Sequence, residues 1–104
     1  MIVNLNKPLT DFDGKPVTSG EGPIMLSNLV VQALLAATEN ERNETPQKKL
    51  ERWELARKVH NASKTGSDVE LSAEEIVLIK TRGAEVLSAP AFGPVAEAIE
   101  GKTA

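Results

Sequence analysis

An almost continuous run of apolar residues from Leu26 to Thr38 predicts the central helix of this chain. At 100° per residue, its apolar side chains surround nearly the whole helix, and only Asn28 and Gln32 leave a narrow polar strip. A helix that is apolar on nearly every side must be covered on nearly every side. The run is shorter than the roughly 20 apolar residues that cross a bilayer. We therefore expect a helix capped by Ser27 at the centre of a small soluble domain, with no membrane contact.

Residues 2–18, which precede the central helix, have the pattern of short strands. Apolar and polar positions alternate at the start, and Asp13-Gly14 is a typical hairpin turn because both residues tolerate positive φ. Pro8 and Pro16 cannot donate to a strand ladder, so the strands must be short and at an edge. A Gly- and Ser-rich loop is expected to follow as far as residue 23.

A second helix is predicted to begin after Thr45 and to end near Asn61. Thr45 is a favourable N-cap, and Pro46 occupies the first helical position, where its missing N–H costs nothing. The predicted packing face, with Trp53 as its anchor, consists of Leu50, Trp53 and Ala56, flanked by Leu55 and Val59.

The third helix has the clearest start signal, a capping box formed by Ser72 and Glu75. Gly83 lies on its predicted apolar face and is expected to let another helix approach closely. That face comprises Ile76, Ile79, Gly83, Val86 and Leu87.

Ala89-Pro90 interrupts the helical pattern and separates the third helix from the last one. The final helix is predicted over Ala91–Ile99, and residues 101–104 are expected to fray. The fold class is therefore α+β, with a short N-terminal β-hairpin packed on a bundle of three to four helices. We expect a single domain over 1–104, divided into a hairpin and loop (1–23), a helical part (24–100) and a frayed tail (101–104).

Composition adds limits on chemistry and compartment. Hydrophobic residues make up 40% of the 104 residues and charged residues 26%, which is typical of a globular protein. The chain has no cysteine, which excludes disulfides, thiolate metal ligands and a cysteine nucleophile. No signal peptide or transmembrane run is visible, so a cytoplasmic location is expected.

Charge is unevenly distributed, and the segment 47–64 carries +4 between flanking segments of −3 and −4. A solvated surface explains this pattern, and a basic contact site for an acidic partner is the alternative. That candidate site consists of Lys48, Lys49, Arg52, Arg57 and Lys58.

Two features of this basic segment argue against nucleic-acid binding. On a helical wheel the cations scatter, and Arg57 and Lys58 share a sector with Glu51 and Glu54. A helix-turn-helix motif needs a turn of about three or four residues. The predicted helices are separated by the much longer segment 61–71. A role in binding nucleic acid is therefore the weaker hypothesis.

The sequence offers no recognisable catalytic or metal-binding constellation. His60 is the only histidine and has no acidic residue at ligand spacing. Asp11 and Asp13 precede Gly14 without the other ligands of a calcium loop, so they are interpreted as turn formers. We therefore predict no enzyme activity, no cofactor and no bound metal.

One apolar residue of the third helix falls outside its predicted packing face. Leu78 lies in the sector of Thr81, Arg82 and Glu85, which should face solvent. The contact hypothesis is that Leu78, Arg82 and Glu85 meet a protein partner. The alternative is a single exposed leucine, which needs no functional explanation, or cover by the last helix.

Several segments together resemble a family of small tailed-phage and prophage proteins of about 100 residues. They include Asp11-Phe12-Asp13-Gly14-Lys15-Pro16-Val17, Ala33-Leu34-Leu35, Leu71-Ser72-Ala73-Glu74-Glu75-Ile76-Val77-Leu78-Ile79-Lys80 and Gly93-Pro94-Val95.

The family has no established catalytic residues to transfer to this chain. The resemblance implies a non-enzymatic factor of virion morphogenesis or tail assembly in the bacterial host cell. Such a factor would act by contact with a phage structural or assembly protein, or with itself. The alternative is a small nucleic-acid-binding or regulatory protein that uses the basic segment 48–64.

Overall fold

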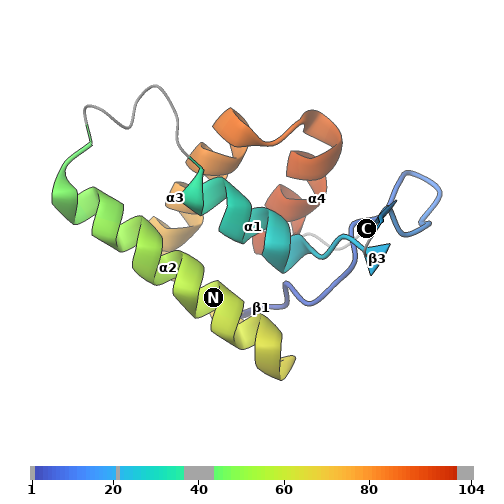
Figure 1. The fold of residues 1–104 in the computed structure, drawn as a ribbon, viewed down its shortest axis with the longest axis horizontal. Coiled ribbons are helices and arrows are strands. Elements are labelled where there is room, and N and C mark those ends of the chain that lie inside the picture. The colour runs from blue at the N-terminus through green and yellow to red at the C-terminus, as the bar shows by residue number, and fades with distance from the viewer. Residues whose placement is uncertain (1, 21, 37–43, 101–104) are drawn as a thin grey trace.

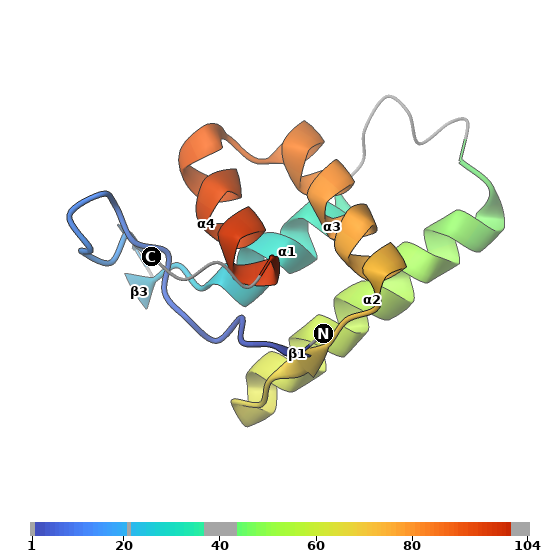
Figure 2. The same cartoon turned by 180° about the vertical axis from the view of Figure 1, so that it is seen from behind.

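Helix α1 (Leu26–Leu35) lies at the centre of the fold (Figure 1). The computed structural model describes residues 2–20, 22–36 and 44–100. Three further helices contact α1, namely α2 (Pro46–Thr65), α3 (Ala73–Val86) and α4 (Ala89–Ile99). Helix α2 lies along one side of α1, and α3 and α4 lie on the other (Figure 2). The α+β class and the central position of the apolar helix are confirmed; the tail 101–104 lies outside the described residues.

The N-terminus of α1 is capped by backbone carbonyls rather than by a side chain. Its N-cap residue is Met25, and the predicted Ser27 cap is wrong because Ser27 lies buried in the first turn. The N–H groups of Leu26 and Ser27 donate to the carbonyls of Lys7 and Leu5, at 2.9 and 3.0 Å. The N-terminal segment therefore satisfies two of the donors that begin a helix without partners.

The strands form two separate two-stranded sheets. Strand β1 (Ile2–Val3) pairs antiparallel with β4 (Val69–Glu70), just before α3, and β2 (Thr18–Ser19) pairs with β3 (Gly22–Pro23). The prediction that the first residues belong to a local hairpin is therefore wrong for β1. The expected loop up to residue 23 instead contains the β2–β3 pair.

The predicted turn at Asp13-Gly14 is confirmed, and a bridge between Thr10 and Pro16 closes it. Gly14 has φ of 79°, the left-handed conformation that glycine adopts without strain. One carboxylate oxygen of Asp11 accepts hydrogen bonds from the N–H groups of Asp13 and Lys15, at 2.9 and 3.0 Å. Asp11 is therefore a turn former, as expected from the sequence.

The predicted packing face of α2 is confirmed for Leu55, Ala56 and Val59 and wrong for Leu50 and Trp53. The buried residues of this helix are Arg52, Leu55, Ala56 and Val59, whereas Trp53 is 53% exposed. Trp53 is not the core anchor, because the buried stripe is centred on Leu55 and Val59, which lie more than 100° around the helix from it. The stripe through Leu55 and Val59 faces α1, and it leaves Trp53 at the edge of the contact. Leu50, the other large apolar residue of the predicted face, is also exposed.

The start of α2 is as predicted, and its end is later. Thr45 accepts a hydrogen bond from the Lys48 N–H, and Pro46 occupies the first turn. The helix continues past Asn61 to Thr65, where Gly66 ends it with φ of 69°. A glycine in the left-handed conformation is a common C-terminal helix cap.

Helices α3 and α4 meet at a glycine contact. A Cβ atom built on Gly83 would lie 2.9 Å from Cδ1 of Phe92, so the predicted close approach is confirmed. Helix α4 begins at Ala89 rather than Ala91, because Pro90 fits the first turn, where a missing N–H costs nothing. The core, to which all four helices contribute, is aliphatic. Its largest fully buried side chains are Val30, Leu34, Val59, Leu71, Ile79, Val95 and Ile99.

Candidate functional site

Two buried arginines converge on the C-terminal end of α1. Nη1 of Arg52, from α2, donates to the carbonyl of Leu34 at 2.8 Å and to that of Ala36 at 3.4 Å. Nε of Arg82, from α3, donates to the carbonyl of Ala33 at 3.3 Å, and its Nη2 donates to Ala36. The last carbonyls of a helix have no helical partner and carry partial negative charge. The two guanidinium groups therefore hold the C-terminal end of α1 to α2 and to α3, and we call Arg52 and Arg82 the arginine clamp.

This arginine clamp removes one residue from each of the two sets of predicted contact residues. Arg52 and Arg82 are each only 5% exposed, so neither is available to a partner. Leu78 is half-buried and packs against the core, so its predicted solvent position is also wrong. Glu85 is exposed, and its carboxylate lies 3.8 Å from Nη1 of Arg82.

The remaining basic residues of α2 do not act together with Arg52. Lys48, Lys49, Arg57 and Lys58 are exposed. Nζ of Lys58 forms an ion pair with Glu75 of α3, with 3.2 Å between Nζ and Oε1. The five predicted basic contacts are therefore divided among the protein interior, an ion pair and the surface.

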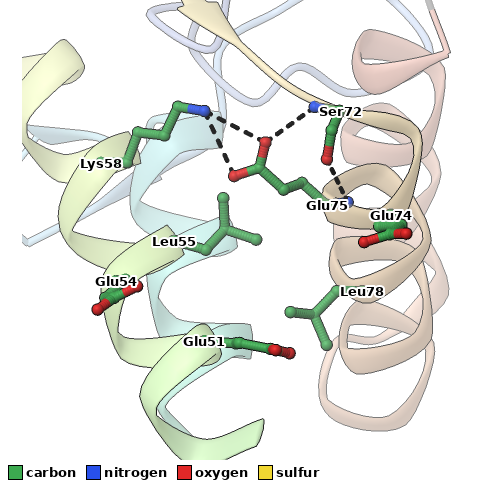
Figure 3. A pocket seen from close by; sticks show the side chains of 8 residues that line it. All are labelled: Glu51, Glu54, Leu55, Lys58, Ser72, Glu74, Glu75 and Leu78. Atoms are coloured by element: carbon green, nitrogen blue, oxygen red, sulfur yellow. Dashed lines mark hydrogen bonds and ion pairs between the residues drawn. The ribbon is translucent and has the colours of Figure 1, made fainter. Parts of the chain in front are cut away.

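A groove of about 390 Å³ lies between α2 and α3, and we call it the acidic groove (Figure 3). Leu55 and Leu78 lie between the two helices and form its apolar floor. Glu51 projects from α2 toward α3. The complete lining is Glu51, Glu54, Leu55, Lys58, Ser72, Glu74, Glu75 and Leu78.

Glu75 joins the capping box of α3 to α2 at one end of the acidic groove. Its Oε1 accepts from the Ser72 N–H at 2.8 Å, and the Ser72 hydroxyl accepts from the Glu75 N–H, which confirms the predicted capping box. Partial burial by itself raises the pKa of Glu75. The Ser72 N–H and the Lys58 ammonium together outweigh this, so the pKa lies below its usual value.

We expect Glu75→Gln to flatten the acid branch of the stability profile. Because the folded-state pKa is lowered, the carboxylate stabilises the fold above its unfolded pKa, and this contribution is lost as pH falls through the folded pKa. Glutamine keeps the side-chain cap without the charge. Thermal melts at neutral and acidic pH should show a smaller acid-induced decrease in Tm for Glu75→Gln. Glu74→Gln is the matched control, and an equal effect of both variants would contradict this role.

A second groove, of about 450 Å³, lies between α1 and α2, and we call it the aromatic groove. Trp53, which is 53% exposed, forms part of its wall, and Leu35 of α1, which is 47% exposed, also lines it. Within the described part of the chain, its lining side chains are apolar, neutral polar, histidine and arginine. It consists of Val31, Leu35, Trp53, Ala56, Arg57, His60 and Asn61.

The sequence pattern did not identify the aromatic groove because it assigned Trp53 to the core. The spacing of Leu55 and Val59 could have revealed it. These two residues define an apolar stripe on another side of the helix from Leu50 and Trp53, and if that stripe packs on the core, Trp53 is left exposed. His60 lies in this groove, but no group of metal-ligating side chains occurs within the described ranges. None of the described helices is long and apolar enough to cross a membrane.

Comparison with family models, curated proteins and solved structures finds no match for this chain. The surface of the protein, and above all the exposed Trp53, is therefore the structural feature that points to its function.

Proposed function

We propose that this protein is a non-enzymatic factor that acts by protein–protein contact through the aromatic groove. The observation that carries the proposal is the exposure of Trp53 beside Leu35, in a groove whose described lining residues include no carboxylate. Tryptophan and arginine are the residues most often found as energetic anchors of protein interfaces. Both occur here, at Trp53 and Arg57, one helical turn apart on α2.

The resemblance to tailed-phage proteins supports a role for this contact in virion morphogenesis or tail assembly. The partner is then a phage structural or assembly protein, or another copy of the chain, in the cytoplasm of the host bacterium. A nucleic-acid-binding role has less support, since Arg52 is bonded to α1 and Lys58 to Glu75. Phosphate contacts need cations that remain available on one face.

The test is capture of partners by tagged protein in phage-producing cells, with Trp53→Glu as the disabling variant. We expect Trp53→Glu to lose a specific captured phage protein, because a carboxylate replaces the exposed aromatic anchor. Its Tm should change little, since Trp53 lies outside the buried face of α2.

The matched control is Val77→Glu, which changes another exposed apolar residue, on α3. This variant should capture the same phage protein as the wild type. Equal capture by wild type and Trp53→Glu would contradict the proposed contact. Loss of capture by both variants would show that apolar exposure in general, not this groove, is responsible.

A further inference from the structure

The two grooves that border α2 have opposite charge. Among the residues that the structure describes, the aromatic groove is lined by Arg57 and by no carboxylate, whereas the acidic groove is lined by four glutamates and by Lys58 as its one cation. Lys58 is already paired with Glu75. Once this ion pair is set aside, the net charge of the described lining residues is positive in the aromatic groove and negative in the acidic groove.

The charged side chains that remain are exposed and have no described ion pair. Glu51 and Glu54 on α2 and Glu74 on α3 are exposed, as is Arg57. Within the described ranges, the ion pairs of the two groove linings are limited to the one between Lys58 and Glu75. These four side chains can therefore meet an external partner without breaking an existing ion pair.

The two grooves lie on different sides of α2. Residues 53, 56 and 60 of α2 face the aromatic groove beside α1, and residues 51, 54 and 58 face the acidic groove beside α3. Figures 1 and 2 show α1 and α3 beside α2 from the two opposite views. A partner on one groove thus leaves the other groove of the same molecule accessible.

We propose that a second copy of this chain occupies the aromatic groove and presents its acidic groove to it. In this contact Trp53 of one copy lies toward the Leu78 floor of the other, and Arg57 lies beside Glu51 and Glu54. Charge complementarity between the grooves favours this pairing, since opposite charges across an interface attract and fix its orientation. The inference rests on the proposed function, because both use the surface around Trp53.

Charge also argues against a symmetric pairing of two aromatic grooves. That arrangement would bring two Arg57 side chains together, and the described part of either lining offers them no carboxylate. When two copies meet through two different surfaces, one copy keeps a free aromatic groove and the other keeps a free acidic groove. Such an interface extends into a ring or a chain of copies rather than stopping at a dimer.

Sedimentation velocity of the purified protein over a concentration series tests this proposal. The wild type should form dimers and then larger species as its concentration rises. Trp53→Glu removes the aromatic anchor, and Glu51→Lys with Glu54→Lys reverses the acidic wall. Each of these variants should sediment as a monomer when examined alone.

An equimolar mixture of the two variants should form a dimer and nothing larger. The lysine variant supplies the intact aromatic groove, and Trp53→Glu supplies the intact acidic groove, so only one interface can form. Val77→Glu should assemble like the wild type. Glu74→Lys, on the α3 wall, is a second and independent disruption of the acidic groove, and it should weaken association because it reduces the negative charge that faces Arg57 of the other copy.

Three results would overturn the proposal. A wild type that stays monomeric at every concentration excludes a second copy as the occupant. A mixture that stays monomeric, although the wild type associates, shows that the interface is symmetric or lies elsewhere. Association that survives the acidic-groove substitutions rules out the acidic groove as the partner surface. If Trp53-dependent capture of a phage protein persists in any of these cases, the proposed function stands and only this inference fails.

Discussion

Replacing Arg82 by methionine is expected to lower the free energy of unfolding by about 2–4 kcal/mol. Methionine keeps most of the apolar stem but removes the donors to the carbonyls of Ala33 and Ala36. Those carbonyls lie at the C-terminal end of α1, where a positive charge is also favourable. The loss therefore combines charge-assisted hydrogen bonds with the cost of leaving buried acceptors unpaired.

Urea denaturation of Arg82→Met and of a control, Arg57→Met, measures this effect. Arg57 is an exposed arginine of α2, so its replacement should change stability by no more than about 0.5 kcal/mol. Equal effects of the two substitutions would show that the arginine clamp does not stabilise the fold.

Leu34→Ala should be the most destabilising single truncation in α1, at about 2–5 kcal/mol. Leu34 is completely buried in the helix that contacts all three others, so the substitution removes apolar contacts and leaves a cavity. Ser72→Ala, which removes only the capping hydroxyl of α3, should cost about 1 kcal/mol. Chemical denaturation of both variants measures the difference. An equal or inverted order would mean that the packing around α1 contributes less than its burial indicates.

Signals that act within a few residues were sufficient to predict much of this fold. The capping box at Ser72, the proline at the start of α2 and the Asp13-Gly14 turn each depend on neighbours along the chain. The burial of α1 was also predictable, because a helix without a wide polar face has no side to leave in water. Gly83 was interpreted correctly for a similar reason, since a helix-interior glycine needs a packing explanation.

The features that bear on function depend on contacts between distant elements. A helical wheel places an arginine at the surface, but Arg52 and Arg82 become buried because α1 offers them unpaired carbonyls. Arg52 belongs to the buried face of α2, whereas Trp53 of the same helix is largely exposed. Neither the burial of these arginines nor the exposure of Trp53 can be predicted from residue types alone. The pairing of β1 with β4 is equally hidden, because a two-residue strand carries no signal that identifies its partner.

The arginine clamp makes α1 depend on helices that are synthesised after it. The ribosome delivers α1 early, together with the Leu5 and Lys7 carbonyls that cap its first turn. The donors for its last turn, Arg52 of α2 and Arg82 of α3, are synthesised after α1 itself. Until then, nascent chains carry an apolar helix whose far end and flanks lack partners, and exposed apolar surface of this kind promotes aggregation. The first helix of the fold thus receives the hydrogen-bond donors for its last turn only when the third helix is in place.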